Sequence, residues 1–392
     1  MIVGLTALLT LIDLFGPQAI APALTTAFRT TPAYMGIVIN AATVGMAISG
    51  FFTACIADRI ERKPAMIVAL LLLSIPTFLL GRAPDLMIFA ALRILQGLLM
   101  CASFTVAIAY VAEEWGPSGG APLVMAAYVT GNVGSNLLGR VLTGSVAQYA
   151  GWRGAFVLLA AMNLAGGILL WIVLPRSERF HRKRHDGRIV VSLRRHLRNP
   201  RLRGAYGIGF LILFSFIGIF TYVNFLLARP PFSLAPAAIG ALYSVFLASL
   251  LATPAAGPAV RSLGSAASIL LGAAVSLGGV LLTLCTTVST VMAGLALVGV
   301  GTFFCQAVAT GFVGKVGGKA KAAASGLYLA CYYSGGICGA LLIGLIYDRW
   351  AWPGCVAVTG IAFVLMALIP FIAWREAAMP RRPAGAETSE QG

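Results

Sequence analysis

Three ionisable residues lie inside long apolar stretches of the sequence: Asp13, Arg93 and Arg140. A charged side chain in the hydrocarbon core of a membrane costs roughly 2.5 to 3.5 kcal/mol, so each is a functional candidate by default. At Asp13, the loss of water favours the neutral carboxyl group and brings its protonation within reach. We therefore predict that Asp13 binds and releases the proton that drives the protein. The alternative is a structural ion pair or hydrogen bond that holds two helices together.

The composition indicates that membrane helices position these residues. The 392-residue chain is 59% hydrophobic with a mean hydropathy of +0.92, which is too apolar for one water-soluble core. An apolar stretch of about 20 residues crosses a bilayer as a helix, whereas barrel strands would alternate polar and apolar residues. We count twelve such segments, at residues 5–27, 34–56, 65–81, 87–112, 121–146, 153–174, 204–228, 237–257, 266–285, 290–314, 322–346 and 353–374.

The distribution of the +16 net charge predicts the orientation of these segments. With the loop around Arg59 in the cytoplasm, 21 of the 28 basic residues lie on the cytoplasmic side, as the positive-inside rule requires. We then expect both termini in the cytoplasm, and we do not expect the first segment, which holds Asp13 and lacks a basic leader, to be a cleavable signal peptide. The partners expected for the basic loops are anionic lipid headgroups and not nucleic acid.

A basic stretch at residues 175–203 divides the chain into two halves with six segments each. Several residues recur at an offset of 200, among them the pairs Gly139 with Gly339 and Trp152 with Trp352. Two related bundles with a site between them near the midplane are typical of one large class of secondary transporters. The sequence predicts an N-terminal bundle (1–174), a basic cytoplasmic linker (175–203), a C-terminal bundle (204–374) and a disordered cytoplasmic tail (375–392).

Three motifs make the sequence similar to the major facilitator superfamily. Residues 54–63, ACIADRIERK, keep the charges of that family's loop motif G-x-x-x-D-R/K-x-G-R-K but replace both glycines. Arg93, Gln96 and Gly97 match R-x-x-Q-G, and residues 131–140, GNVGSNLLGR, partly match the antiporter motif of the fifth helix. The run resembles the bacterial drug:proton antiporter branch. The resemblance implies an all-α membrane protein in the bacterial inner membrane, with 12 transmembrane helices in two pseudo-symmetric six-helix bundles.

The resemblance also implies roles for individual residues. The loop charges would form a gate that clasps the two halves together on the cytoplasmic side, and their basic members would also face anionic lipid; the alternative is that they only set the topology. Arg93 would tie the fourth helix to the first, although neither arginine is an obvious direct partner of Asp13. For Arg140, contact with substrate and hydrogen bonding to backbone carbonyls both remain open. The predicted gate residues are Asp58, Arg59, Arg62 and Lys63.

The remaining polar and aromatic residues within the segments predict a mainly apolar, aromatic cavity. Such a lining suits an amphipathic organic compound better than a sugar, and two arginines against one aspartate favour a neutral or anionic solute. The predicted cavity residues are Gln18, Gln96, Asn132, Asn136, Arg140, Tyr222, Asn224, Gln306 and Tyr332. Close helix packing, which permits rocking of the halves, is predicted at Gly131, Gly134, Gly139, Gly335, Gly336 and Gly339.

These features predict a monomeric, proton-coupled secondary transporter that exports small amphipathic compounds by alternating access. A proton symporter that imports a small organic anion is the second hypothesis, and a polytopic membrane protein or enzyme without transport activity is the third. No nucleotide-binding loop or HExxH motif is present, so we expect neither catalysis nor a cofactor. No metal site is expected either, since His181, His185 and His196 are interpreted as surface residues of the linker.

Overall fold

The computed structural model describes residues 2–56, 61–115, 121–175, 189–318 and 321–374. All regular elements within these ranges are helices. The N-terminal half consists of α1 (Ile2–Ala19), α2 (Ala21–Ala27), α3 (Pro32–Ile39), α4 (Ala42–Ile56), α5 (Arg62–Leu80), α6 (Leu86–Trp115) and α7 (Ala121–Val173). After α8 (Ile189–Arg198), the C-terminal half consists of α9 (Pro200–Leu227), α10 (Pro236–Leu242), the short 3-10 helix η2 (Tyr243–Val245), α11 (Phe246–Leu282), α12 (Val288–Val316) and α13 (Lys321–Ala373).

Three of the long helices are each two membrane crossings joined at one non-helical residue. The chain reverses at Gly151 (φ 70°) in α7, at Gly264 (φ 83°) in α11 and at Ala351 (φ 50°) in α13. The described residues form nine apolar spans when α1 and α2, bent by 62°, count as one span. Because three of the nine are double, the twelve predicted crossings are all present.

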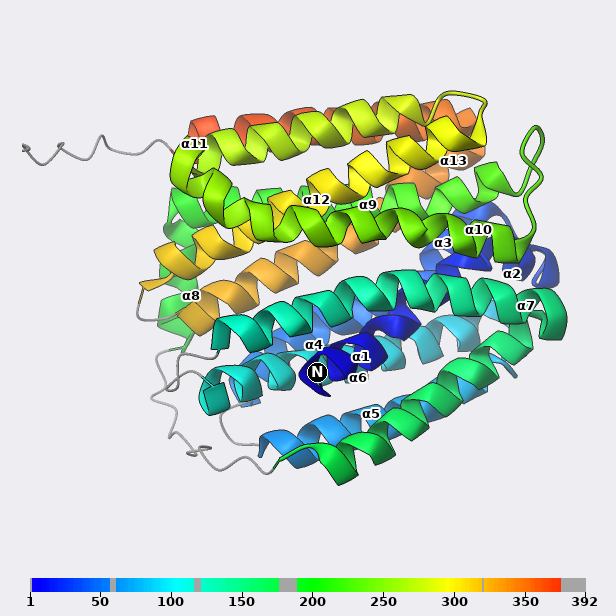
Figure 1. Ribbon diagram of the computed structural model, residues 1–392, viewed down its shortest axis with the longest axis horizontal. Helices are drawn as coiled ribbons and strands as arrows, with labels where there is room; N and C mark the ends of the chain where they lie inside the picture. The colour runs from blue at the N-terminus through cyan, green and yellow to red at the C-terminus, as the bar shows by residue number, and fades with distance from the viewer. Residues whose placement is uncertain (1, 57–60, 116–120, 176–188, 319–320, 375–392) are drawn as a thin grey trace, which may run out of the picture.

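The two halves repeat the same packing. In Figure 1 the N-terminal half lies below and the C-terminal half above. In one half α1 packs along the first crossing of α7, and in the other α9 packs along the first crossing of α13. A Cβ atom at Gly131 would lie 1.9 Å from the carbonyl oxygen of Gly4, and one at Gly335 would lie 2.0 Å from that of Phe210. Only glycine permits this approach, so equivalent small residues set both contacts.

The basic end of the bundle, at the left of Figure 1, carries α8 and the start of α5. Two expectations are wrong here. Arg62 does not face lipid, because α5 packs against α6 and α7 and leaves Arg62 only 1% exposed. His196 is not a surface residue, because α8 packs against α9 and α13 and buries it. Asp58, Arg59, His181 and His185 lie outside the described residues.

The halves meet at the other end of the bundle, which we call the closed end. The amide of Ala33 donates a 3.2 Å hydrogen bond to Asp348 Oδ1 in the other half, and the hydroxyl of Tyr222 lies 3.4 Å from the carbonyl oxygen of Ala33. At Gly144, a Cβ atom would lie 2.5 Å from the carbonyl oxygen of Pro236. Backbone from α7 and α10 therefore lies in direct contact across the interface.

Candidate functional site

Asp13 is fully buried on α1 with one engaged and one free oxygen. Its Oδ2 accepts a 2.6 Å hydrogen bond from Asn163 Nδ2, in the second crossing of α7. Its Oδ1 has no hydrogen-bond partner in the described part of the chain. Asn163 also lies 3.3 Å from Thr77 Oγ1 on α5. A buried carboxyl group with a free oxygen can take up a proton there without losing its existing hydrogen bond.

Arg93 connects this site to two helices at once. Its Nη1 donates 2.7 Å hydrogen bonds to the backbone oxygen of Asp13 and to Gln96 Oε1, and its Nε donates one of 2.7 Å to the backbone oxygen of Ile39. Gln96 Nε2 in turn donates to Thr77 Oγ1 at 2.7 Å. Arg93 on α6 therefore contacts α1 through the backbone oxygen of Asp13, as the resemblance implied for these two helices, and no hydrogen bond joins Arg93 to the carboxylate of Asp13 among the described residues.

Arg140 is a fully buried cation at the interface of the halves. Its Nη1 donates a 2.6 Å hydrogen bond to Asn136 Oδ1, and its Nη2 donates to Gln18 Oε1. Aromatic rings from both halves cover the guanidinium group, with the ring centre of Tyr243 at 4.1 Å and that of Phe15 at 5.1 Å. The contacts of Arg140 with the described residues include no carboxylate; aromatic rings, side-chain amides and the backbone oxygen of Asn136, at 3.3 Å from Nη1, stabilise its charge.

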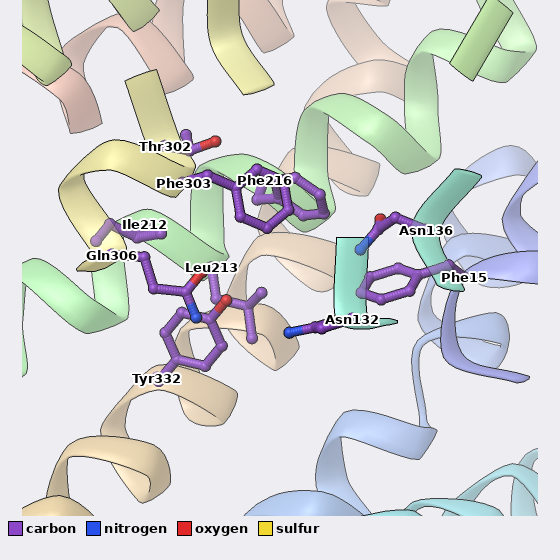
Figure 2. Close-up of a pocket in the computed structure, with 10 residues that line it drawn as sticks. All are labelled: Phe15, Asn132, Asn136, Ile212, Leu213, Phe216, Thr302, Phe303, Gln306 and Tyr332. Atoms are coloured by element: carbon purple, nitrogen blue, oxygen red, sulfur yellow. The ribbon is translucent and has the colours of Figure 1, made fainter. Parts of the chain in front are cut away.

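A small cavity of about 30 Å³ lies between the halves, on the basic side of Arg140. Figure 2 shows Asn132 and Asn136 of α7 on one side, and Gln306 of α12 with Tyr332 of α13 on the other. Asn132, Gln306 and Tyr332 are half-buried, whereas Asn136 is buried. Its other lining residues are Phe15, Ile212, Leu213, Phe216, Thr302 and Phe303.

The residues predicted for the cavity separate into three places. Asn132, Asn136, Gln306 and Tyr332 line it, and Arg140 lies behind Asn136. Gln96 belongs to the hydrogen-bonded cluster around Asp13.

Gln18, Tyr222 and Asn224 lie at or near the closed end, where Asn224 Nδ2 donates a 2.9 Å hydrogen bond to the backbone oxygen of Gln18.

Of the predicted gate residues, Arg62 and Lys63 begin α5.

Three residues with hydrogen-bond or ring contacts in this region were not predicted from the sequence: Asn40, Thr77 and Tyr243. Asn40 interrupts an apolar segment, and this was a usable signal, because a buried amide needs a partner inside a membrane. Thr77 and Tyr243 carried no such signal, since threonine can bond its own helix and tyrosine packs in apolar surroundings.

A family model described as Major Facilitator Superfamily matches residues 3–233 and again residues 228–391. The inner membrane transport protein YnfM of Escherichia coli (strain K12) is 31% identical over 357 residues, which are 91% of this chain and 85% of that protein. A solved structure of a bacterial homologue of the human lysosomal transporter Spinster, in an inward-facing and occupied conformation, has a TM-score of 0.78 at 14% identity. That likeness covers 95% of this chain and 96% of the other and concerns the fold alone.

Shorter similarities involve relatives named for their substrates. The gallate transporter of Pseudomonas putida is 31% identical over 162 residues, which are 41% of this chain and 36% of that protein. The gentisate transporter of Corynebacterium glutamicum is 28% identical over 178 residues, which are 44% of this chain and 39% of that protein.

Proposed function

The chain belongs to the major facilitator superfamily, and we propose that it is a proton-coupled secondary transporter of a small organic anion. Its full-length relatives are named as transporters, which supports transport and not catalysis. The energy comes from the proton gradient without a cofactor, and the working unit is a monomer.

The observation that carries this proposal is the arrangement of Asn136 and Arg140. Arg140 donates a 2.6 Å hydrogen bond to Asn136 Oδ1. The other polar atom of that amide, Asn136 Nδ2, is buried at the cavity wall and has no hydrogen-bond partner in the described structure. A buried donor left unpaired costs about 1 to 3 kcal/mol, and a bound acceptor removes that cost. Because no carboxylate among the described residues contacts the positive charge directly behind this donor, an anionic acceptor such as a carboxylate is favoured.

The rest of the cavity favours an anion with an apolar or aromatic body. Phe15, Phe216 and Phe303 supply apolar walls, and Gln306 with Tyr332 supplies polar groups opposite Asn136. A hydroxylated aromatic acid presents a carboxylate at one end, a ring in the middle and hydroxyl groups elsewhere. The relatives named gallate transporter and gentisate transporter support the same class, so such acids are our first candidate substrates.

The distribution of charge indicates how the protein is oriented in the membrane and in which direction it transports its substrate. With the basic end in the cytoplasm, contact between the halves at the opposite, closed end matches the inward-facing state of an alternating-access cycle. An interior-negative membrane potential opposes the entry of an anion, and one accompanying proton cancels that electrical work. We therefore favour proton symport into the cell, with Asp13 as the proton carrier. Export of amphipathic compounds remains a second candidate, because residues 131–140 partly match an antiporter motif.

Reconstitution in liposomes distinguishes the two candidates. Radiolabelled gentisate should accumulate in vesicles when the outside is acidified, and a protonophore should abolish the accumulation. Benzyl alcohol, which has a similar ring but no charge, is the matched control and should not accumulate. Failure of gentisate, gallate and benzoate to enter on a proton gradient, together with proton-driven extrusion of neutral or cationic amphiphiles, would replace this proposal with the export function.

A further inference from the structure

Two interrupted helices face each other beside Arg140, and a polar residue occupies each interruption. Gln18 lies in the last turn of α1, before the 62° bend into α2, and Asn40 lies between α3 and α4. Gln18 Nε2 donates a 2.9 Å hydrogen bond to Asn40 Oδ1. Both side chains are almost wholly buried, at 0% and 1% exposed.

Asn40 also reaches the other half of the protein. Its Nδ2 donates to Thr221 Oγ1 on α9 at 3.0 Å and to the backbone oxygen of Gly36 at 2.8 Å. The Gly36 oxygen also accepts the backbone N–H of Asn40 at 3.2 Å, so the side chain adds a second bond at the end of α3, and the Thr221 bond crosses the interface. The amide therefore joins the break in one half to a helix in the other.

The break between α3 and α4 is also hydrogen-bonded from the side of Asp13. Arg93 Nε donates to the backbone oxygen of Ile39, the residue before Asn40, and Arg93 Nη1 donates to the backbone oxygen of Asp13. From the cavity side, Arg140 Nη2 donates to Gln18 Oε1. One series of hydrogen bonds thus leads from Asp13 through Arg93 to Ile39, and another leads from Arg140 through Gln18 to Asn40, the next residue.

We propose that Asn40 is a positioning residue that transmits the protonation state of Asp13 to the closed end of the cavity. This inference rests on the proposed proton coupling. Arg93 is the charged group that faces Asp13 in the described structure, while α5 and α7 contribute the neutral Thr77 and Asn163. Protonation of Asp13 removes the negative charge that attracts Arg93, which loosens the hold of Arg93 on Ile39. The hydrogen bond from Asn40 to Thr221 then breaks more readily, and the closed end opens.

A double-mutant cycle read by hydrogen–deuterium exchange tests this transmission without needing a substrate. Asp13→Asn mimics the protonated carboxyl group at constant pH, and backbone exchange of peptides covering residues 28–35 and 228–236 reports opening of the closed end. We expect Asp13→Asn to raise that exchange at least fivefold in the wild-type background, within the roughly 5- to 150-fold range of allosteric couplings. In an Asn40→Ala background the same replacement should change exchange less than twofold.

Tyr222→Phe is the matched control, because it removes a different contact between the halves and leaves the Asn40 contacts in place. The response to Asp13→Asn should persist in this background even if basal exchange rises. Thr221→Val breaks the same bond from the other half and should behave as Asn40→Ala does, which keeps the test valid if Asn40→Ala does not fold.

The inference would be overturned if Asp13→Asn did not change backbone exchange at the closed end in the wild-type background. It would also be overturned if Asp13→Asn raised that exchange equally with and without the bond from Asn40 to Thr221. Failure of the liposome experiment would remove the proposed substrate and leave the outcome of this cycle unchanged.

Discussion

Arg140 holds Asn136 Oδ1 at 2.6 Å and thereby turns the amide nitrogen of Asn136 toward the cavity between the two halves (Figure 2). The guanidinium group therefore sets the hydrogen-bonding direction of a neighbour while remaining buried behind it. A free asparagine could offer either end of its amide, but this one offers a donor. The pair thus selects for an acceptor, and the charge of Arg140, which contacts no carboxylate in the part of the chain that the structure describes, selects for a negative one.

Replacement of Arg140 should weaken the binding of anions much more than that of neutral analogues. Hydrogen bonds to charged groups contribute about 1.5 to 3 kcal/mol, so Arg140→Gln should weaken gentisate binding by roughly 10- to 100-fold. Binding of gentisamide, the neutral amide, should weaken less than threefold. Lys315→Gln removes an exposed positive charge on α12 and should change neither affinity. Equal losses for acid and amide in direct binding measurements would show that Arg140 acts only through packing.

A carboxylate at position 136 should reverse the preference of the cavity. In Asn136→Asp the new group pairs with Arg140, which neutralises the cation and repels an incoming carboxylate. We expect proton-driven gentisate uptake to fall at least tenfold while the melting temperature stays at or above that of the wild type. Asn132→Asp adds the same charge to the half-buried part of the cavity wall, at a residue that is not among the hydrogen-bond partners of Arg140 described above, and should lower uptake less. Full uptake by Asn136→Asp would exclude Asn136 as the anion contact.

Asp13→Asn should separate proton-driven accumulation from exchange. The amide keeps a hydrogen-bonding oxygen for Asn163 but cannot bind and release a proton, so the variant should fold and insert normally. Accumulation of gentisate on a proton gradient should disappear, whereas exchange of internal for external gentisate should remain within a few-fold of the wild-type rate. Transport that stays driven by pH in this variant would remove Asp13 from the mechanism.

A single methyl group at Gly144 should force the closed end apart. A Cβ atom there would lie 2.5 Å from the backbone oxygen of Pro236, which cannot rotate away as a side chain can. Overpacking of this kind costs about 1 to 3 kcal/mol in the state that makes the contact, so Gly144→Ala should favour the open state roughly 5- to 150-fold.

Accessibility labelling of the closed end gives the measurement. Gly278→Ala is the control, because a Cβ atom there would meet no side chain and no neighbouring helix of the described structure within 4 Å, and it should leave labelling unchanged. Unchanged labelling in Gly144→Ala would mean that this contact does not limit opening.

Much of the fold followed from local chemistry, because a bilayer imposes a strict length and polarity on each crossing. The twelve segments and the offset of 200 were readable in the sequence, and the chain reverses at Gly151 and Ala351 with that same offset. What failed depended on packing between distant elements. Arg62 and His196 looked like solvent or headgroup residues, and only their neighbouring helices bury them.

By itself, the sequence determined that the chain crosses a membrane in two related bundles and that Asp13, Arg93 and Arg140 are buried in it, since apolar length and isolated charge are local properties. The tertiary structure decided their partners: Asn163 for Asp13, the backbone of Ile39 for Arg93, and Asn136 with Gln18 for Arg140. Hydrogen bonds form over about 3 Å between atoms that are up to 150 residues apart along the chain, and spacing within single helices carries no information about such distances.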